Sequence, residues 1–137
     1  PNLPNVHVVA ANTYAILQHS KAALVTSGTA TLETALLNVP EIVCYKGNPI
    51  TLALAKRFVK IKFIALVNLI MDKEVVKELI QEDLTTKQLS IELKKLLEDP
   101  AKQAGIKADY AALKQALTTG HKATEVAAKI IQETLNK

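Results

Sequence analysis

The sequence predicts an α/β fold in which a Rossmann-like parallel sheet is flanked by helices and followed by a helical C-terminal part. In the first half, short β-branched runs alternate with segments of helix length, the spacing typical of parallel βαβ units. In the second half only helical patterns occur. At 137 residues, with 49% hydrophobic and 22% charged residues, the composition is that of one globular domain, to which we assign residues 1–137.

The first half is expected to contain four buried strands and three helices. The strands are predicted at Val6–Val9, Ala22–Val25, Glu41–Tyr45 and, with the weakest pattern, Phe63–Val67. The helices are predicted at Thr13–His19, Thr29–Leu37 and Pro49–Lys60. Sheets of this kind bind their ligands beyond the carboxyl ends of the strands, so the turns that follow the strands are the places to look for a site.

The second half is expected to form three helices. The first follows a capping box at Thr85–Gln88 and carries an apolar stripe made of Leu89, Leu93, Leu96 and Leu97. Pro100 separates it from a second helix, which Gly120 is expected to end. The buried face of that second helix is marked by Ile106, Tyr110, Leu113 and Leu117, and that of the last helix by Val126, Ala127, Ile130 and Ile131.

Composition excludes several classes of function. The net charge of +4 favours anionic partners only weakly, and two Phe, three Tyr and no Trp offer little for base stacking, so we expect no nucleic acid partner. Cys44 is the single cysteine, which rules out an internal disulfide and favours a cytoplasmic setting. The three histidines have no metal-ligand spacing. No signal sequence or spanning segment of ~20 apolar residues is visible, and the start at Pro1 without Met suggests an excised piece.

A candidate anion site follows the second predicted strand. Ser27, Gly28 and Thr29 lie at the carboxyl end of that strand, and Thr29 opens the next helix. Free N–H groups and the helix dipole favour an anion at such a terminus, and a phosphate is the obvious candidate. Gly28 permits close approach of the backbone, whereas Ser27, Thr29 and Thr31 supply hydroxyl groups. Many structural turns use the same residues only as a cap, so this pattern alone leaves both interpretations open.

Glu33 is the one acid on this helix. The buried face is predicted from the spacing of Leu32, Ala35, Leu36 and Val39, and Glu33 lies about 100° round the helix from Leu32. A carboxylate cannot bind phosphate, but it can accept hydrogen bonds from two adjacent hydroxyls such as a ribose diol. The alternative is an exposed acid that stabilises the helix N-terminus, and spacing does not decide between the two.

Two blocks of sequence resemble a known enzyme family. "LVTSGTATLETALLNVPEIVCYK" and "LALAKRFVKIKFIALVNLIMDKEVVKELIQED" strongly resemble lipid-A-disaccharide synthase, a bacterial glycosyltransferase of the two-domain GT-B class. The resemblance is dense from about Tyr14 to Gln81 and continues loosely through "GHKATEVAAKII". It covers only the C-terminal half of such an enzyme. The N-terminal domain, which holds the acceptor and supplies the proposed base, is absent.

The resemblance implies a domain that binds UDP-2,3-diacylglucosamine. The family transfers the diacylglucosaminyl unit, with inversion, onto 2,3-diacylglucosamine 1-phosphate in lipid A biosynthesis and releases UDP. It implies that Glu33 contacts the ribose and that Ser27, Gly28 and Thr29 face the phosphates. It also places Asn68 near the donor sugar or diphosphate, with Gln81 a weaker candidate. Asn68 is the only candidate catalytic residue in this half.

The sequence has no pattern for a metal site and one candidate segment for membrane contact. No D-x-D pair occurs to hold a metal, and the GT-B class generally works without one, so no cofactor is expected. Lys46 and Arg57 are candidates for added positive charge at the phosphates or for a solvated surface role. The basic run "AKRFVKIK" is a candidate for peripheral contact with the inner membrane, although a solvated basic helix face has the same pattern.

Two other functions remain open at this stage. One is another GT-B enzyme of UDP-sugars, such as a glucosaminyltransferase or an epimerase. The other is a non-catalytic α/β interaction module in which "SGTATLE" is only a capped turn. Binding of UDP distinguishes the enzymes from the module, and the acyl chains on the donor distinguish the two enzymes.

Overall fold

Three parallel strands form the centre of the fold. The computed structural model describes residues 4–26, 28–47, 62–118 and 131–134. In it, β1 (Ala23–Val25), β2 (Glu41–Tyr45) and β3 (Lys77–Ile80) form a sheet in the order β1-β2-β3. Both pairings are parallel, with Val25 opposite Val43 and Cys44 opposite Leu79. A parallel sheet flanked by helices confirms the predicted Rossmann-like α/β fold.

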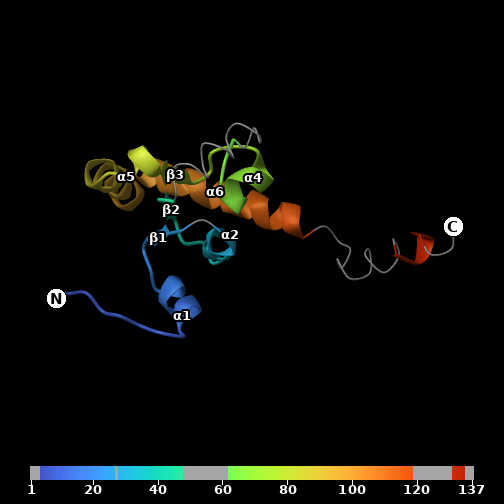
Figure 1. Cartoon of the computed structure of the whole chain (residues 1–137), viewed down its shortest axis with the longest axis horizontal. Coiled ribbons are helices and arrows are strands. Elements are labelled where there is room, and N and C mark those ends of the chain that lie inside the picture. Colours follow the sequence, from blue (N-terminus) through green and yellow to red (C-terminus); the bar gives the residue numbers. More distant parts are fainter. Residues whose placement is uncertain (1–3, 27, 48–61, 119–130, 135–137) are drawn as a thin grey trace.

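The described helices surround this sheet. They are α1 (Thr13–Gln18), α2 (Thr29–Leu36), α4 (Leu66–Met71), α5 (Thr86–Glu98) and α6 (Pro100–Leu117), with a short 3₁₀ helix, η1 (Gln81–Asp83), directly after β3. Residues 131–134 are also helical. The long α6 passes alongside the sheet and packs against α2, α4 and α5 (Figure 1). α2 also packs against α4.

The core lies between the sheet and α6. The buried residues of the strands include Ile42, Val43 and Leu79, and α6 contributes its predicted stripe of Ile106, Tyr110 and Leu113. The fourth member of that stripe, Leu117, is 44% exposed, because α6 ends there and no described element covers its last turn. Burial of the others removes apolar surface from water and is the main stabilising term of the fold.

The sequence correctly marks where α5 and α6 begin. The Thr85 hydroxyl accepts a hydrogen bond from the Gln88 amide at 3.2 Å, as expected for the N-cap of α5. Asp99 caps α6 by accepting from the amides of Ala101 and Lys102, and Pro100 occupies the first turn.

The apolar stripe predicted for α5 is correct for three of its four leucines. Leu96 is buried, whereas Leu89 and Leu93 are partly buried against the core. Leu97 is 44% exposed. Consecutive residues lie about 100° apart on a helix, so Leu96 and Leu97 cannot both face the core.

Two of the four predicted strands are wrong. Val6–Val9 forms no strand, and Val8 is 97% exposed. Within the described residues β1 pairs only with β2, so these valines have no partner strand, and β-propensity alone does not hold an isolated run in a sheet. Phe63–Val67 is also not a strand: it leads into α4, because the carboxylate of Glu78 binds the amides of Ile64 and Ala65 at the start of that helix.

The third strand lies at Lys77–Ile80, where the sequence analysis predicted no strand. The predicted helix at Pro49–Lys60 falls outside the described residues. So do Ser27, Arg57, Gly120, most of the basic run "AKRFVKIK", and Val126, Ala127 and Ile130 of the last predicted helix. The remaining member of that helix, Ile131, is 59% exposed.

Candidate functional site

The candidate site lies at the edge of the sheet where all three strands end. Because the strands are parallel, their carboxyl ends share this edge. Gly28 follows β1 by three residues, Gly47 follows β2 by two, and Gln81 comes directly after β3. The side-chain amide of Gln81 donates to the backbone carbonyl of Gly47 at 2.9 Å, which ties the second strand end to the third. Two of the residues predicted for the site therefore lie at one sheet edge.

Gly28 has a backbone conformation that favours glycine. Its φ of 126° and ψ of −162° lie in a region that L side chains rarely adopt, and a Cβ there would be strained although nothing lies within 4 Å of it. Gly28 is also the N-cap of α2 and has no side chain with which to cap it. Position 28 therefore supplies no side-chain cap to the first amides of α2.

The hydroxyl of Thr31 is used within the protein. Thr31 is fully buried, and its Oγ1 donates to the Gly28 carbonyl at 2.9 Å. The buried residues of α2 are Thr31, Thr34 and Ala35. The predicted buried face is therefore partly wrong, since Leu36 is exposed. The threonines can be buried because each hydroxyl returns to a backbone carbonyl of its own turn, Thr34 to Ala30 at 2.8 Å. The Thr31 hydroxyl therefore stabilises the turn at the start of α2.

Glu33 lies on α2 beside an aromatic side chain from α1. Its residue is half-buried, one turn beyond the helix start. The charge of Glu33 and a hydrogen bond to it raise the pKa of the Tyr14 phenol above its ordinary value. Tyr14 itself is 58% exposed. The Tyr14 phenol therefore lies close to the Glu33 carboxylate. The sequence analysis did not single out Tyr14.

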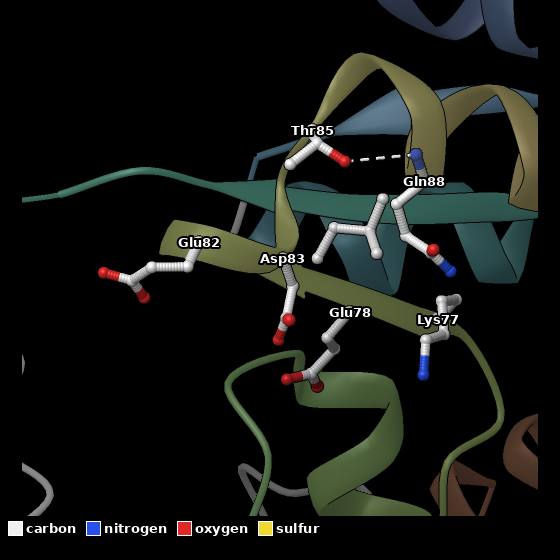
Figure 2. Close-up of a pocket in the computed structure, with 7 residues that line it drawn as sticks. Lys77, Glu78, Glu82, Asp83, Thr85 and Gln88 are labelled. Atoms are coloured by element: carbon white, nitrogen blue, oxygen red, sulfur yellow. Dashed lines mark hydrogen bonds between the residues drawn. The ribbon is translucent and has the colours of Figure 1, made fainter.

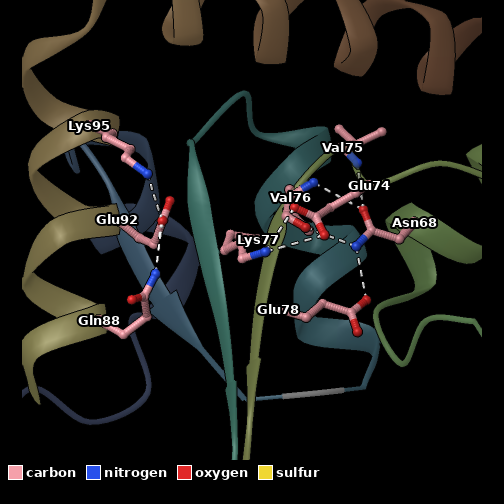
Figure 3. A network of polar contacts seen from close by, with 9 residues as sticks. All are labelled: Asn68, Glu74, Val75, Val76, Lys77, Glu78, Gln88, Glu92 and Lys95. Carbon is pink, nitrogen blue, oxygen red and sulfur yellow. Dashed lines mark hydrogen bonds and ion pairs between the residues drawn. The ribbon is translucent and has the colours of Figure 1, made fainter. Parts of the chain in front are cut away.

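Asn68 has a surrounding different from the one expected of a ligand-binding residue. It is fully buried in α4. Its Oδ1 accepts from the amides of Val75 and Val76 at 2.8 and 2.9 Å. Its Nδ2 donates to the Val76 carbonyl at 2.8 Å and to Oε1 of Glu78 at 2.9 Å (Figure 3). These four bonds use both protons and both lone pairs of the amide. The predicted contact of Asn68 with a donor stays a prediction.

Glu78 is the partner that the sequence analysis missed. Its two carboxylate oxygens accept from the amides of Ile64 and Ala65 at 3.0 to 3.1 Å, in addition to the bond from Asn68. These amides precede and open α4, so Glu78 acts as a cap supplied from a neighbouring strand. Its only signal in the sequence is an acid inside the apolar run "VVKELI".

A cavity of about 390 Å³ lies beside β3 and the start of α5. Glu78, Glu82 and Asp83 line it, together with Lys77, Thr85 and Gln88, and in Figure 2 the side chain of Glu78 points toward α4. Three carboxylates repel a diphosphate, so this cavity does not suit the phosphates of a nucleotide.

A buried carboxyl group without a partner lies at the opposite end of β2. Glu41 is fully buried, and neither of its carboxylate oxygens has a hydrogen-bond partner in the described structure. Burial raises its pKa from 4.5 to about 9. The nearby Tyr110 donates to the Val39 carbonyl at 3.2 Å, and burial, followed by the charge of Glu41, raises the pKa of its phenol. Because Glu41 begins β2, it lies away from the carboxyl edge.

Charged and metal-binding groups add little to the edge. Lys46, one of the two cations predicted near the phosphates, is exposed just after β2. In the part of the chain that the structure describes, no group of three or more His, Cys, Asp or Glu side chains could hold a metal ion. Within the same part, none of the helices has the length and apolar character needed to cross a bilayer.

Comparison with known proteins points to one family. The family profile described as lipid-A-disaccharide synthetase matches residues 2–132. The lipid-A-disaccharide synthase of Geobacter sulfurreducens is 35% identical over 133 residues, which cover 97% of this chain and 34% of that protein. The enzyme of the same name from Acidobacterium capsulatum is 36% identical over 98% of this chain and 34% of its own length. The one from Gluconobacter oxydans is 48% identical over 59% of this chain and 20% of its own. The chain thus spans about a third of the length of the first two relatives.

Proposed function

Because this chain belongs to the lipid-A-disaccharide synthetase family, we propose that it is the C-terminal, donor-binding domain of a glycosyltransferase. In this proposal a UDP-sugar binds at the carboxyl edge of the sheet. The full enzyme transfers 2,3-diacylglucosamine from UDP, with inversion, onto 2,3-diacylglucosamine 1-phosphate in the cytoplasm during lipid A biosynthesis. The acceptor domain lies in the part of the enzyme outside this chain, and this chain alone is inactive.

The observation that carries the proposal is the convergence of predicted site residues at one sheet edge. Gly28 opens α2 with a backbone that only glycine adopts readily, Glu33 lies one turn further on, and Gln81 is bonded to Gly47 at the end of the neighbouring strand. The N-terminus of α2 supplies amide donors and a positive dipole end to the diphosphate. Ser27 and Thr29 add hydroxyls at the same turn.

Each group has a distinct task in the proposed reaction. Departure of UDP develops negative charge on the diphosphate, and the fixed amides of the α2 N-terminus stabilise that charge without reorganisation. The carboxylate of Glu33 accepts hydrogen bonds from the two ribose hydroxyls. Positive charge from Lys46, which is exposed just after β2, adds to the field at the phosphates. The proposal requires no metal ion.

Calorimetric titration with UDP tests the proposal. UDP is expected to bind this chain, ADP and uridine more weakly, and Glu33→Ala at least tenfold more weakly than the parent, because the variant loses the acceptor for the ribose hydroxyls. Glu98→Ala is the matched control, since Glu98 is an exposed acid at the far end of α5. Equal affinity of UDP for the parent and Glu33→Ala would refute the role of Glu33.

The same titration separates the competing functions. A folded parent chain that binds no UDP would favour an interaction module, in which "SGTATLE" only caps a turn. If UDP binds, full-length enzyme assayed with acylated and non-acylated UDP-glucosamine identifies the donor. Preference for the acylated donor supports the lipid A reaction, and indifference to the acyl chains supports another GT-B enzyme of UDP-sugars. A requirement for magnesium would contradict the metal-free mechanism.

A further inference from the structure

Seven hydrogen bonds join Asn68 and Glu78 to each other and to the backbone around them. Three run from the backbone amides of Ile64 and Ala65 to the carboxylate of Glu78, three join Asn68 to Val75 and Val76, and one joins the two side chains. We call fully buried Asn68 and half-buried Glu78 together the clamp. These bonds hold the start of α4 in a fixed position relative to the turn that leads into β3 (Figure 3).

The clamp is connected both to α2 and to the carboxyl end of β3. α4 packs against α2, the helix that carries Glu33, and both helices contribute a fully buried residue to the common core, Val67 from α4 and Ala35 from α2. β3 ends at Ile80, two residues after Glu78, and the next residue, Gln81, turns the chain with a φ of 52° and donates its side-chain amide to the Gly47 carbonyl. Packed interiors transmit displacement because they contain few voids. A shift of α4 or β3 therefore displaces Glu33 or Gln81.

We propose that Asn68 and Glu78 are positioning residues of the donor site, which hold α2 and the end of β3 in place and do not themselves touch the donor. This inference rests on the proposed function and changes the role expected of Asn68. The reason is its hydrogen-bond inventory: an amide whose four capacities are all satisfied inside the protein has none left for a sugar or phosphate. A ligand would have to break a bond in a buried network, which is costly.

The test combines nucleotide affinity with two readouts by nuclear magnetic resonance. Affinity for UDP is measured for the parent, Glu78→Ala, Glu78→Gln and the control Glu74→Gln, all at a temperature at which circular dichroism shows them folded. Glu74 is exposed, pairs only with Lys77 among the described residues, and lies four residues before Glu78. Amide exchange reports the caps at Ile64 and Ala65. The side-chain NH₂ signals of Asn68 report whether UDP touches it.

The positioning role predicts a defined set of results. Glu78→Ala exchanges faster at Ile64 and Ala65 and binds UDP at least tenfold more weakly. Glu78→Gln, which keeps one carbonyl oxygen for Ala65 and Asn68, recovers part of the loss. Glu74→Gln matches the parent. In the parent, the Asn68 NH₂ signals stay protected and do not move when UDP saturates the site.

Two results would overturn the inference. One is a folded Glu78→Ala or Glu78→Gln variant with fast exchange at Ile64 and Ala65 but unchanged affinity for UDP. The other is a large shift of the Asn68 NH₂ signals on addition of UDP, which would make Asn68 a direct ligand. If Glu78→Ala does not fold, Glu78→Gln and the Asn68 signals still decide the matter. A parent that binds no UDP refutes the proposed function instead, and the exchange data then test the clamp alone.

Discussion

Replacing Glu41 by methionine is expected to stabilise the protein at neutral pH. Burial raises the pKa of Glu41 from 4.5 to about 9, so the folded protein keeps the carboxyl protonated at pH 7 while the unfolded chain ionises it. Taking up that proton costs the folded state 1.36 kcal/mol for each pH unit above 4.5, which amounts to about 3 kcal/mol at pH 7. Methionine has similar length, does not titrate and leaves no buried polar atom without a partner.

The pH dependence of stability provides an independent check. Between pH 4.5 and 9 the folded state binds one more proton at Glu41 than the unfolded state, so this group lowers the free energy of unfolding as pH rises through that window. Below 4.5 both states are protonated and the cost disappears. The slope, about 1.4 kcal/mol per pH unit, is expected to be absent from the methionine variant.

Urea denaturation of the parent, Glu41→Met and Glu98→Met at several pH values measures both effects. Glu98 is largely exposed on α5, so its replacement serves as the matched surface control and is expected to change stability by less than about 0.5 kcal/mol. A Glu41→Met variant that is no more stable than the parent at pH 7, with the same slope against pH, would refute the reasoning.

Three further outcomes follow from single contacts. Cys44, whose pKa burial raises, should react with a thiol reagent at pH 8 more slowly than free cysteine, and an equal rate would place it outside the sheet interior. Asp99→Ala should lower the free energy of unfolding by about 1 to 2 kcal/mol, because two amides at the start of α6 lose their acceptor. The control in the same urea experiment is Asp83→Ala, which removes an exposed acid on η1. Equal stability of the two variants would contradict the capping role of Asp99. Thr31→Val should lower the free energy of unfolding by about 1 kcal/mol, because the hydrogen bond to the Gly28 carbonyl is lost. Titration of the same variant with UDP shows whether the conformation of this turn also affects binding.

The two strands that the sequence predicts correctly are neighbours in the sheet and pair with each other. Glu41–Tyr45 is the central strand of the sheet, and its apolar run correctly predicts that most of the strand is buried. Val6–Val9 has an equally good local pattern but no neighbouring strand among the described residues, so the same propensity leaves it exposed. Strand pairing is a property of distant residues, and a local pattern cannot show it.

The third strand was hidden by two features. Lys77 and Glu78 interrupt its apolar run, and Glu78 points a carboxylate into the protein, where it meets amides from residues 64 and 65. The same long-range contact turns Phe63–Val67 into a helix start. Neither result follows from propensity, because in both the deciding hydrogen bonds span 13 or 14 positions of sequence.

The candidate site was predictable where local geometry defines it. The start of α2 at Thr29 follows from the turn sequence, and the parallel topology brings Gln81 to the same edge of the sheet as Gly28. The surroundings of Asn68 and Thr31 were not predictable, because whether a polar side chain faces a ligand or a backbone carbonyl depends on packing. Tyr14 and Glu78 were missed for the same reason.

The most direct test of the account is to map UDP onto the backbone amides of the isotopically labelled chain. The account predicts that saturating UDP shifts the signals of Gly28, Thr29, Glu33, Gly47 and Gln81, the carboxyl edge of the sheet. Signals near Glu41, at the opposite end of β2, should stay in place. Shifts concentrated away from the carboxyl edge, or no shifts in a folded chain, would contradict the assignment of this edge as the donor site.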